Sequence, residues 1–84
     1  MPDIDIYTRA FCGYCAAARK LLKNKGVDFN EIDVTMNQEL RKEMVERSGR
    51  KTVPQIFIGG RHVGGYDDIN ALEKQGRLDE LLAP

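Results

Sequence analysis

The sequence predicts an α/β fold in which a four-stranded mixed sheet carries helices on both of its faces. Segments typical of strands and of helices alternate along the chain in the order β-α-β-α-β-β-α. A strand–helix–strand unit brings its two strands together in parallel through a right-handed crossover. The glycine pair Gly59-Gly60 lies between the last two strands and favours a tight antiparallel hairpin. Parallel and antiparallel pairing in one sheet, with helices between strands, is typical of a small layered α/β protein.

The composition is typical of one small globular domain, which we expect to span residues 1–84. The chain has 13 basic and 13 acidic residues, so no overall field attracts it to nucleic acid or to an anionic membrane. No apolar run reaches the roughly 18 residues that a membrane-spanning helix needs. Residues 1–5 lack the basic and apolar regions of a secretory signal. We therefore expect a monomer of the reducing cytoplasm, where structural disulfides are rare.

The first strand and helix are expected at Ile4–Tyr7 and Gly13–Lys25. The strand segment is apolar and rich in β-prone residues. Gly26 follows the helix, as is usual for the residue after a helix C-terminus. Residues spaced at the helical period form one stripe along this helix, and they are Cys15, Ala18, Leu21, Leu22 and Lys25.

A second strand and helix follow. Val27–Val34 alternates in the manner of a strand. Thr35 and Gln38 fit a capping box, which predicts Thr35 as the N-cap of the next helix. Gly49 ends that helix, whose apolar stripe contains Leu40, Met44 and Val45.

The last third of the chain contains the hairpin and one more helix. Val53–Ile58 is a strand entered through a proline, and Arg61–Gly64 returns from the glycine pair as its partner. Asp67 or Asp68 is expected to cap a helix that ends at Gly76. A short amphipathic turn closes the chain with Leu78, Leu81 and Leu82.

The two cysteines of the chain, Cys12 and Cys15, form a C-x-x-C motif at the start of the first helix. One helical turn separates their Cβ atoms by about 5–6 Å, so a small adjustment permits a disulfide. Such a short loop stabilises little, which favours a bond that opens and closes. The helix N-terminus and Arg9 favour a thiolate on Cys12, whereas Cys15 lies on the apolar stripe. Cys12 is therefore predicted as the nucleophile and Cys15 as the resolving thiol.

Two other interpretations of these cysteines stay open. A zinc site needs about four ligands, and His62 is the one histidine available beside the two thiols. The cysteines can also act as small buried hydrophobes. Both are weaker than the redox interpretation, because a C-x-x-C beside a βαβ pattern is typical of a thioredoxin-like dithiol.

Three motifs in this order make the chain resemble a small bacterial-type dithiol glutaredoxin. They are Cys12-Gly13-Tyr14-Cys15, Thr52-Val53-Pro54 and Gly64-Gly65-Tyr66-Asp67-Asp68. The resemblance covers essentially the whole chain. It implies a thioredoxin fold and a glutathione-disulfide oxidoreductase that uses glutathione to reduce protein disulfides and glutathionylated proteins. It also makes ribonucleotide reductase a plausible client.

The resemblance implies a glutathione groove beside the cysteines. Tyr14 would flank it, and Arg9 would meet the glycine carboxylate of glutathione. Val53 would pair its backbone with the cysteinyl unit, as an added strand does, next to a cis-proline at Pro54. A helix N-terminus suits the γ-glutamyl carboxylate, and an aspartate suits its ammonium. The implied glutathione-binding residues are Arg9, Tyr14, Thr52, Val53, Pro54, Gly65, Tyr66, Asp67 and Asp68.

Simpler roles compete with several of these assignments. Pro54 can be a trans proline at a strand start, and Tyr66 can pack on the core instead of the groove. Asp67 and Asp68 can be helix caps alone. His62 is expected to be exposed and without a role. A solvated basic face is expected from Arg41, Lys42, Arg47, Arg50 and Lys51.

One departure from the usual family motif raises a second hypothesis. Gly13 stands where proline is commoner in dithiol members of the family. Relatives with small residues there can hold a bridging [2Fe–2S] cluster between two monomers. Cys12 of each chain and two glutathiones would supply its four thiolates. The presence of Cys15 favours the redox function instead, since binding a cluster requires no resolving thiol. A further alternative is a thioredoxin-like electron donor recharged by a reductase.

Overall fold

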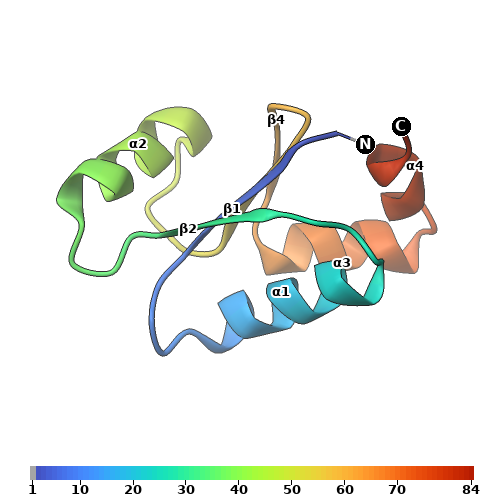
Figure 1. Cartoon of the computed structure of the whole chain (residues 1–84), viewed down its shortest axis with the longest axis horizontal. Coiled ribbons are helices and arrows are strands. Elements are labelled where there is room, and N and C mark those ends of the chain that lie inside the picture. Colours follow the sequence, from blue (N-terminus) through green and yellow to red (C-terminus); the bar gives the residue numbers. More distant parts are fainter. Residues whose placement is uncertain (1) are drawn as a thin grey trace.

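The computed structural model describes residues 2–84. Its strands and helices follow one another as the sequence predicts, with a last short helix in place of the closing turn (Figure 1). The strands are β1 (Ile4–Thr8), β2 (Asn30–Asp33), β3 (Gln55–Ile58) and β4 (Arg61–Gly64). The helices are α1 (Gly13–Asn24), α2 (Gln38–Ser48), α3 (Tyr66–Lys74) and α4 (Leu78–Leu82).

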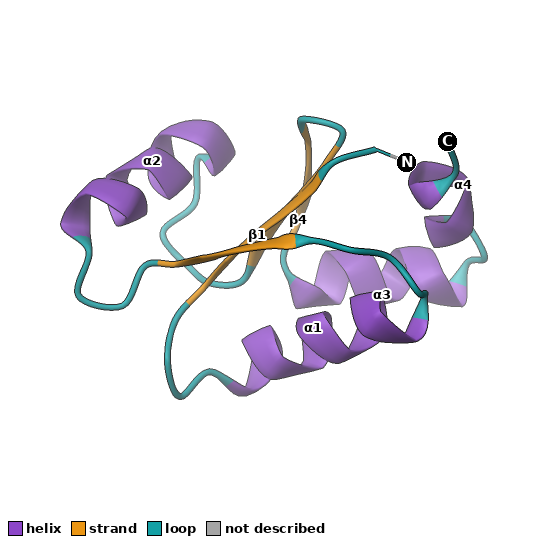
Figure 2. Cartoon of the chain, in the orientation of Figure 1, coloured by secondary structure: helices purple, strands orange, loops and turns teal. Residues whose placement is uncertain are grey.

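The strands form one mixed sheet in the order β2-β1-β3-β4. The β1–β2 pair is parallel, and β1–β3 and β3–β4 are antiparallel. Helices α1 and α3 cover one face of the sheet, and α2 lies over the other (Figures 1 and 2). This arrangement confirms the predicted mixed sheet with helices on both faces.

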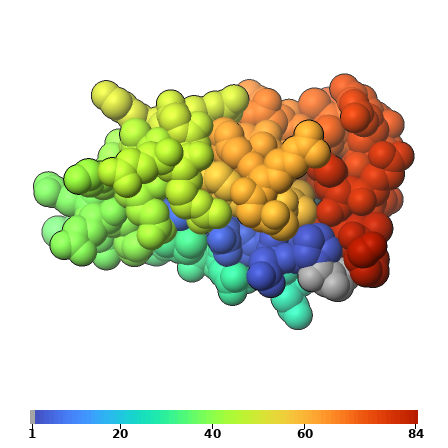
Figure 3. All heavy atoms as spheres, turned by 90° about the horizontal axis from the view of Figure 1, so that it is seen from above, coloured from blue at the N-terminus to red at the C-terminus, as the bar shows by residue number. Residues whose placement is uncertain are grey.

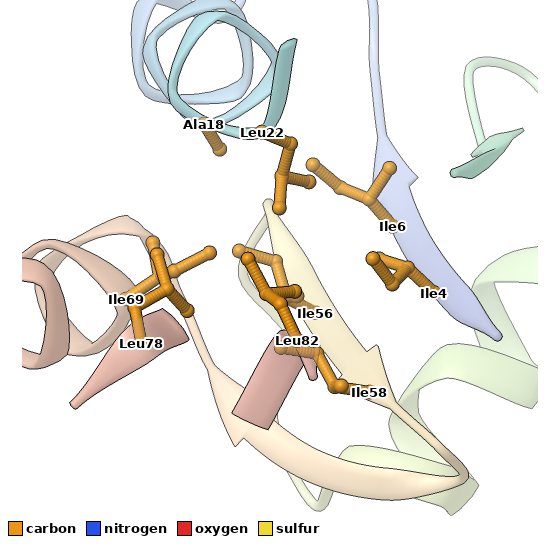
Figure 4. Packing of buried hydrophobic residues seen from close by; sticks show 9 residues of the cluster. All are labelled: Ile4, Ile6, Ala18, Leu22, Ile56, Ile58, Ile69, Leu78 and Leu82. Carbon is orange, nitrogen blue, oxygen red and sulfur yellow. The ribbon is translucent and has the colours of Figure 1, made fainter. Parts of the chain in front are cut away.

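The period of two along β1 and β3 divides the core between the two faces. Ile4 and Ile6 point toward α1 and α3, whereas Tyr7 points toward α2. Figure 4 shows the larger cluster, in which side chains of both central strands meet those of three helices. Its members are Ile4, Ile6, Ala18, Leu22, Ile56, Ile58, Ile69, Leu78 and Leu82. The smaller cluster under α2 contains Tyr7, Val34, Met44 and Phe57.

Helix α2 leaves part of its sheet face open. Seen from that side, the hairpin segment (orange) lies beside α2 (green) and reaches the surface (Figure 3). The two central glycines of this hairpin, Gly59 and Gly60, have φ values of 60° and 79°. Positive φ at both positions is the backbone of a type I′ turn, so the predicted hairpin is confirmed.

Two strands are shorter than the sequence predicts. The strand expected over Val27–Val34 is observed over Asn30–Asp33, and Val27 and Phe29 before it pack against the larger cluster. The strand expected over Val53–Ile58 begins at Gln55. The two residues before it form the loop that carries the cis peptide described below.

The N-cap of α2 also differs from the prediction. Asn37, rather than Thr35, is the N-cap, and its side chain accepts a hydrogen bond from the Leu40 N–H at 3.0 Å. The Thr35 hydroxyl instead accepts the Ala10 N–H at 2.7 Å and so ties the loop after β2 to the loop after β1. Gly49 ends the helix with φ 73°, as predicted. Within residues 2–84, no helix is long and apolar enough to cross a membrane.

Candidate active site

The two cysteines lie at the junction of β1 and α1. Cys12 is the N-cap of α1, one position earlier than the predicted first turn, and its Sγ accepts the Cys15 N–H at 3.2 Å. Both are free thiols. Cys12 is partly exposed, whereas Cys15 is fully buried. The sulfur that solvent and a substrate can reach is therefore that of Cys12, at the positive end of the helix dipole.

The electrostatics of the buried thiol support a division of roles. Burial, followed by the hydrogen bond with Cys12, raises the pKa of Cys15 to about 11. A thiol with this pKa is almost wholly protonated near neutral pH. Cys15 is therefore a poor nucleophile in the resting protein, and it needs Cys12 to be engaged before it has a disulfide to attack.

A groove lies between the start of α1, the loop before β3 and the start of α3, and Tyr14, two residues after Cys12, is part of its lining. The Val53–Pro54 peptide in its floor is cis, as predicted. Tyr14 stacks on Tyr66 across it, with ring centroids 6.0 Å apart. The side chains around the groove are Tyr14, Arg50, Thr52, Val53, Pro54, Gln55, Gly65, Tyr66, Asp67 and Asp68. The structure thus gathers every residue of the predicted glutathione set except Arg9.

Tyr66 contributes to both the core and the groove. It packs against the larger hydrophobic cluster and also lines the groove. Its stacking partner Tyr14 is 65% exposed. The two alternatives for Tyr66 are therefore both realised.

Arg9 lies in a neighbouring hollow. This hollow is lined by Arg9, Arg41 and Lys51 on its basic side, and it shares Thr52 and Val53 with the groove. The loop before β3 is therefore the common wall of the two hollows. Arg9 lies on the other side of this loop from the groove.

The start of α3 differs from the predicted cap. Gly65 is the N-cap, and Asp68, in the third helical position, accepts the Gly65 N–H at 2.9 Å. Arg50 reaches the same carboxylate at 3.0 Å. The Gly65 N–H and then Arg50 hold the pKa of Asp68 below its usual range. Because Gly65 has no side chain, this end of the helix can approach the Pro54 carbonyl closely. A Cβ at position 65 would lie 3.3 Å from that carbonyl oxygen.

The predicted basic face is only partly solvated. Arg47 stacks its guanidinium 4.0 Å above the Phe57 ring, donates to the Tyr7 hydroxyl at 2.8 Å and pairs with Asp5. Arg50 pairs with Asp68, as described above. Both were expected to be free in solvent, and period and composition give no signal for these long-range partners.

His62 is not the exposed, idle residue that the sequence suggests. It is partly buried, its ring lies 5.0 Å from Phe57, and its Nε2 lies 2.8 Å from the Gln55 side-chain oxygen. Burial and then Arg50 lower the pKa of His62, against an opposite effect of Asp68. Sequence reasoning also missed Gln55, although a polar residue in an otherwise apolar strand is a usable signal.

The fold and this dithiol define the class of the molecule, which is the thioredoxin-like class. A family model described as Glutaredoxin matches residues 4–63. The chain belongs to the glutaredoxin family, whose members are thiol oxidoreductases. The resemblance stated from the sequence motifs is therefore confirmed.

Three relatives illustrate how far the similarity extends. A glutaredoxin of Pseudomonas aeruginosa is 54% identical over 83 residues, which cover 99% of this chain and 99% of that protein. The solution structure of a Brucella melitensis glutaredoxin is 62% identical with a TM-score of 0.86, and covers 98% of this chain and 89% of that one. A buckwheat glutaredoxin–glutathione complex is 27% identical with a TM-score of 0.87, and covers 96% of this chain and 76% of that one.

Proposed function

We propose that this chain, acting as one domain, is a glutathione-dependent thiol–disulfide oxidoreductase that reduces protein disulfides and glutathionylated proteins. The observation that carries the proposal is the unequal pair of thiols at the edge of the groove. Cys12 is reachable and Cys15 is buried with a pKa raised to about 11. We place the reaction in a reducing compartment, the cytoplasm, where glutathione keeps thiols reduced.

With a protein disulfide, the Cys12 thiolate attacks one sulfur, and the other sulfur leaves as a thiolate that takes up a proton. Cys15 then gives up its proton and attacks the Cys12 sulfur. The Cys12–Cys15 disulfide forms as the bond between Cys12 and the substrate sulfur breaks. The substrate is released as a dithiol, reduced by two electrons. One glutathione opens this disulfide by bonding to Cys12. A second attacks that mixed disulfide, which yields glutathione disulfide and restores the dithiol.

With a glutathionylated protein, Cys12 alone suffices. It attacks the glutathione sulfur, and the protein thiol leaves. A free glutathione then attacks the glutathionyl-Cys12 disulfide and leaves as glutathione disulfide. Cys15 takes no part in this route.

The lining of the groove supports glutathione as the reductant. Glutathione is an extended tripeptide, and the backbone N–H and C=O groups of Val53 can pair with it as a strand edge pairs with an added strand. The N-terminus of α3 suits a carboxylate, and the Asp68 carboxylate next to it suits an ammonium. Arg9, in the adjoining hollow, suits the second carboxylate.

Two cysteine variants test the proposal. Cys12→Ser should abolish the reduction of both substrate types, because no reachable thiol remains. Cys15→Ser should keep glutathione-dependent deglutathionylation of a peptide and lose dithiol reduction of a protein disulfide. Steady-state rates at increasing glutathione concentration measure both the deglutathionylation of the peptide and the reduction of the protein disulfide. Retained dithiol activity in Cys15→Ser would contradict the division of roles.

The alternative of a thioredoxin-like electron donor predicts a different reductant. In that case a pyridine-nucleotide-linked reductase, and not glutathione, would restore the dithiol of the wild-type protein. Substrate reduction with glutathione alone, without any reductase acting directly on this chain, excludes that alternative.

A bridging [2Fe–2S] cluster stays a second hypothesis. Gly13 is a small residue with open space around it, since a Cβ there would meet nothing within 4 Å, and the neighbouring Cys12 is partly exposed. Residues 2–84 contain no group of three or more His, Cys, Asp or Glu side chains placed to hold a metal ion. A cluster would therefore take one thiolate from Cys12 and draw the others from glutathione and a second copy. Visible absorbance and dimer mass after anaerobic preparation with glutathione test this, and a colourless monomer counts against it.

A further inference from the structure

Gln55 is a buried polar residue in the wall of the groove. It is 1% exposed, and it opens β3 opposite Tyr7. Its Nε2 donates to the Thr52 carbonyl at 3.0 Å and to the Thr52 hydroxyl at 3.2 Å. Burying an amide in an otherwise apolar strand is unfavourable unless its polar atoms find partners, so the position of this side chain is tightly specified.

The chemistry of the partners fixes the orientation of the amide. A carbonyl oxygen can only accept, so the NH₂ end of Gln55 must face Thr52. The amide oxygen therefore faces His62, at 2.8 Å from Nε2. An amide oxygen can only accept as well, so Nε2 of His62 carries the hydrogen. The result is a directed chain of hydrogen bonds from His62 through Gln55 to Thr52.

This series of hydrogen bonds ends at Thr52, in the loop that forms the wall between the two hollows. Thr52 lines both the groove and the hollow that contains Arg9. The residue after Thr52 is Val53, whose backbone groups are those proposed to pair with glutathione. No strand ladder holds this loop, since β3 begins only at Gln55. The Gln55 amide therefore supplies a fixed attachment for a segment that the sheet does not hold.

We propose that Gln55, oriented by His62, is a positioning residue that holds the Thr52–Val53 wall in the conformation that binds glutathione. The inference rests on the function proposed above and adds two residues, on β3 and β4, that act through Thr52 and not on the reacting sulfur atoms. Its consequence is kinetic. Loss of the attachment weakens glutathione binding and leaves the reaction of Cys12 intact.

The test is a double-mutant cycle with Gln55→Met, His62→Phe and the double variant. Methionine keeps the length of the side chain and loses both donors. The apparent KM for glutathione should rise about two- to tenfold in Gln55→Met, with kcat for deglutathionylation within about twofold. His62→Phe should give a smaller rise. Because His62 acts through Gln55, the double variant should be no worse than Gln55→Met alone.

Thr8→Val is the matched control. Thr8 is also 1% exposed, its hydroxyl donates to Glu31 of β2 at 2.8 Å, and it lines neither of the two hollows. Its loss should lower the thermal midpoint without raising the KM for glutathione. An unchanged KM in Gln55→Met, or additive effects of the two substitutions, overturns the positioning role. Absence of glutathione-dependent turnover in the wild type instead overturns the proposed function itself.

Discussion

At the scale of single residues, the two thiols differ because the backbone holds them at different depths. Cys12 ends the loop and keeps its sulfur at the surface, whereas Cys15 lies one turn into α1 on the buried stripe with Ala18 and Leu22. The spacing of three residues keeps the two sulfur atoms near each other, and the position of Cys12 at the N-cap leaves its sulfur reachable while Cys15 is enclosed.

The first prediction concerns the reactivity of Cys15. In Cys12→Ser the only remaining thiol is Cys15, and iodoacetamide should modify it slowly near neutral pH. Burial is the first cause of the raised pKa of Cys15 and remains in this variant, so the thiolate fraction and the rate should rise about tenfold per pH unit between about pH 8 and pH 10. The same variant unfolded in urea is the control, and its rate should level off near pH 9. A folded-state rate that levels off there contradicts the raised pKa.

At the scale of the elements, side chains and glycines at helix ends decide where each helix begins. Asn37 starts α2 and Gly65 starts α3. For α2 the alternative cap, Thr35, is engaged by the Ala10 N–H, whereas for α3 the Asp68 side chain turns back to the Gly65 N–H.

For α2, Asn37→Ala should lower the free energy of unfolding by about 1 kcal/mol, because the first turn loses its cap. Urea denaturation measures the change. Gln38→Ala is the control, since a capping box built on Thr35 would need Gln38 and the observed cap does not. An effect at Gln38 comparable to that at Asn37 would restore the Thr35 assignment.

For α3, Gly64 is the sensitive position. Its φ is 126°, and a Cβ there would lie 2.6 Å from Cγ of Asp68. Gly64→Ala should therefore cost about 2–4 kcal/mol of stability and, by displacing Asp68, raise the KM for glutathione. Gly13→Ala meets nothing within 4 Å and should change stability by less than about 0.5 kcal/mol. Equal thermal midpoints for the two variants would refute this.

At the scale of the whole molecule, the sheet separates two cores of unequal size. The larger one joins α1, α3 and α4 to the central strands, and so ties the Cys12 end of α1 to the Gly65 end of α3 (Figure 4). The groove lies where these two helices begin. Its shape therefore depends on packing some distance from any residue that lines it.

Ile69 tests how much the larger core depends on α3, because it is fully buried there. Ile69→Ala should lower the free energy of unfolding by about 2–5 kcal/mol. Leu81→Ala, at a partly buried position on the rim of the same core, should cost clearly less. Chemical denaturation compares the two, and equal losses would show that the core does not centre on α3.

The sequence by itself determined the order of the elements, the hairpin and the unequal roles predicted for Cys12 and Cys15. These features depend on signals within a few neighbouring residues: apolar period, glycine pairs, the three-residue spacing of two thiols. The tertiary structure alone decided the partners of Arg50, Gln55 and His62, and it selected Asn37 over Thr35 as a cap. Those outcomes depend on hydrogen bonds and ion pairs between segments distant in the chain. A polar group takes whichever partner folding brings to it, and Thr35 was already engaged by Ala10.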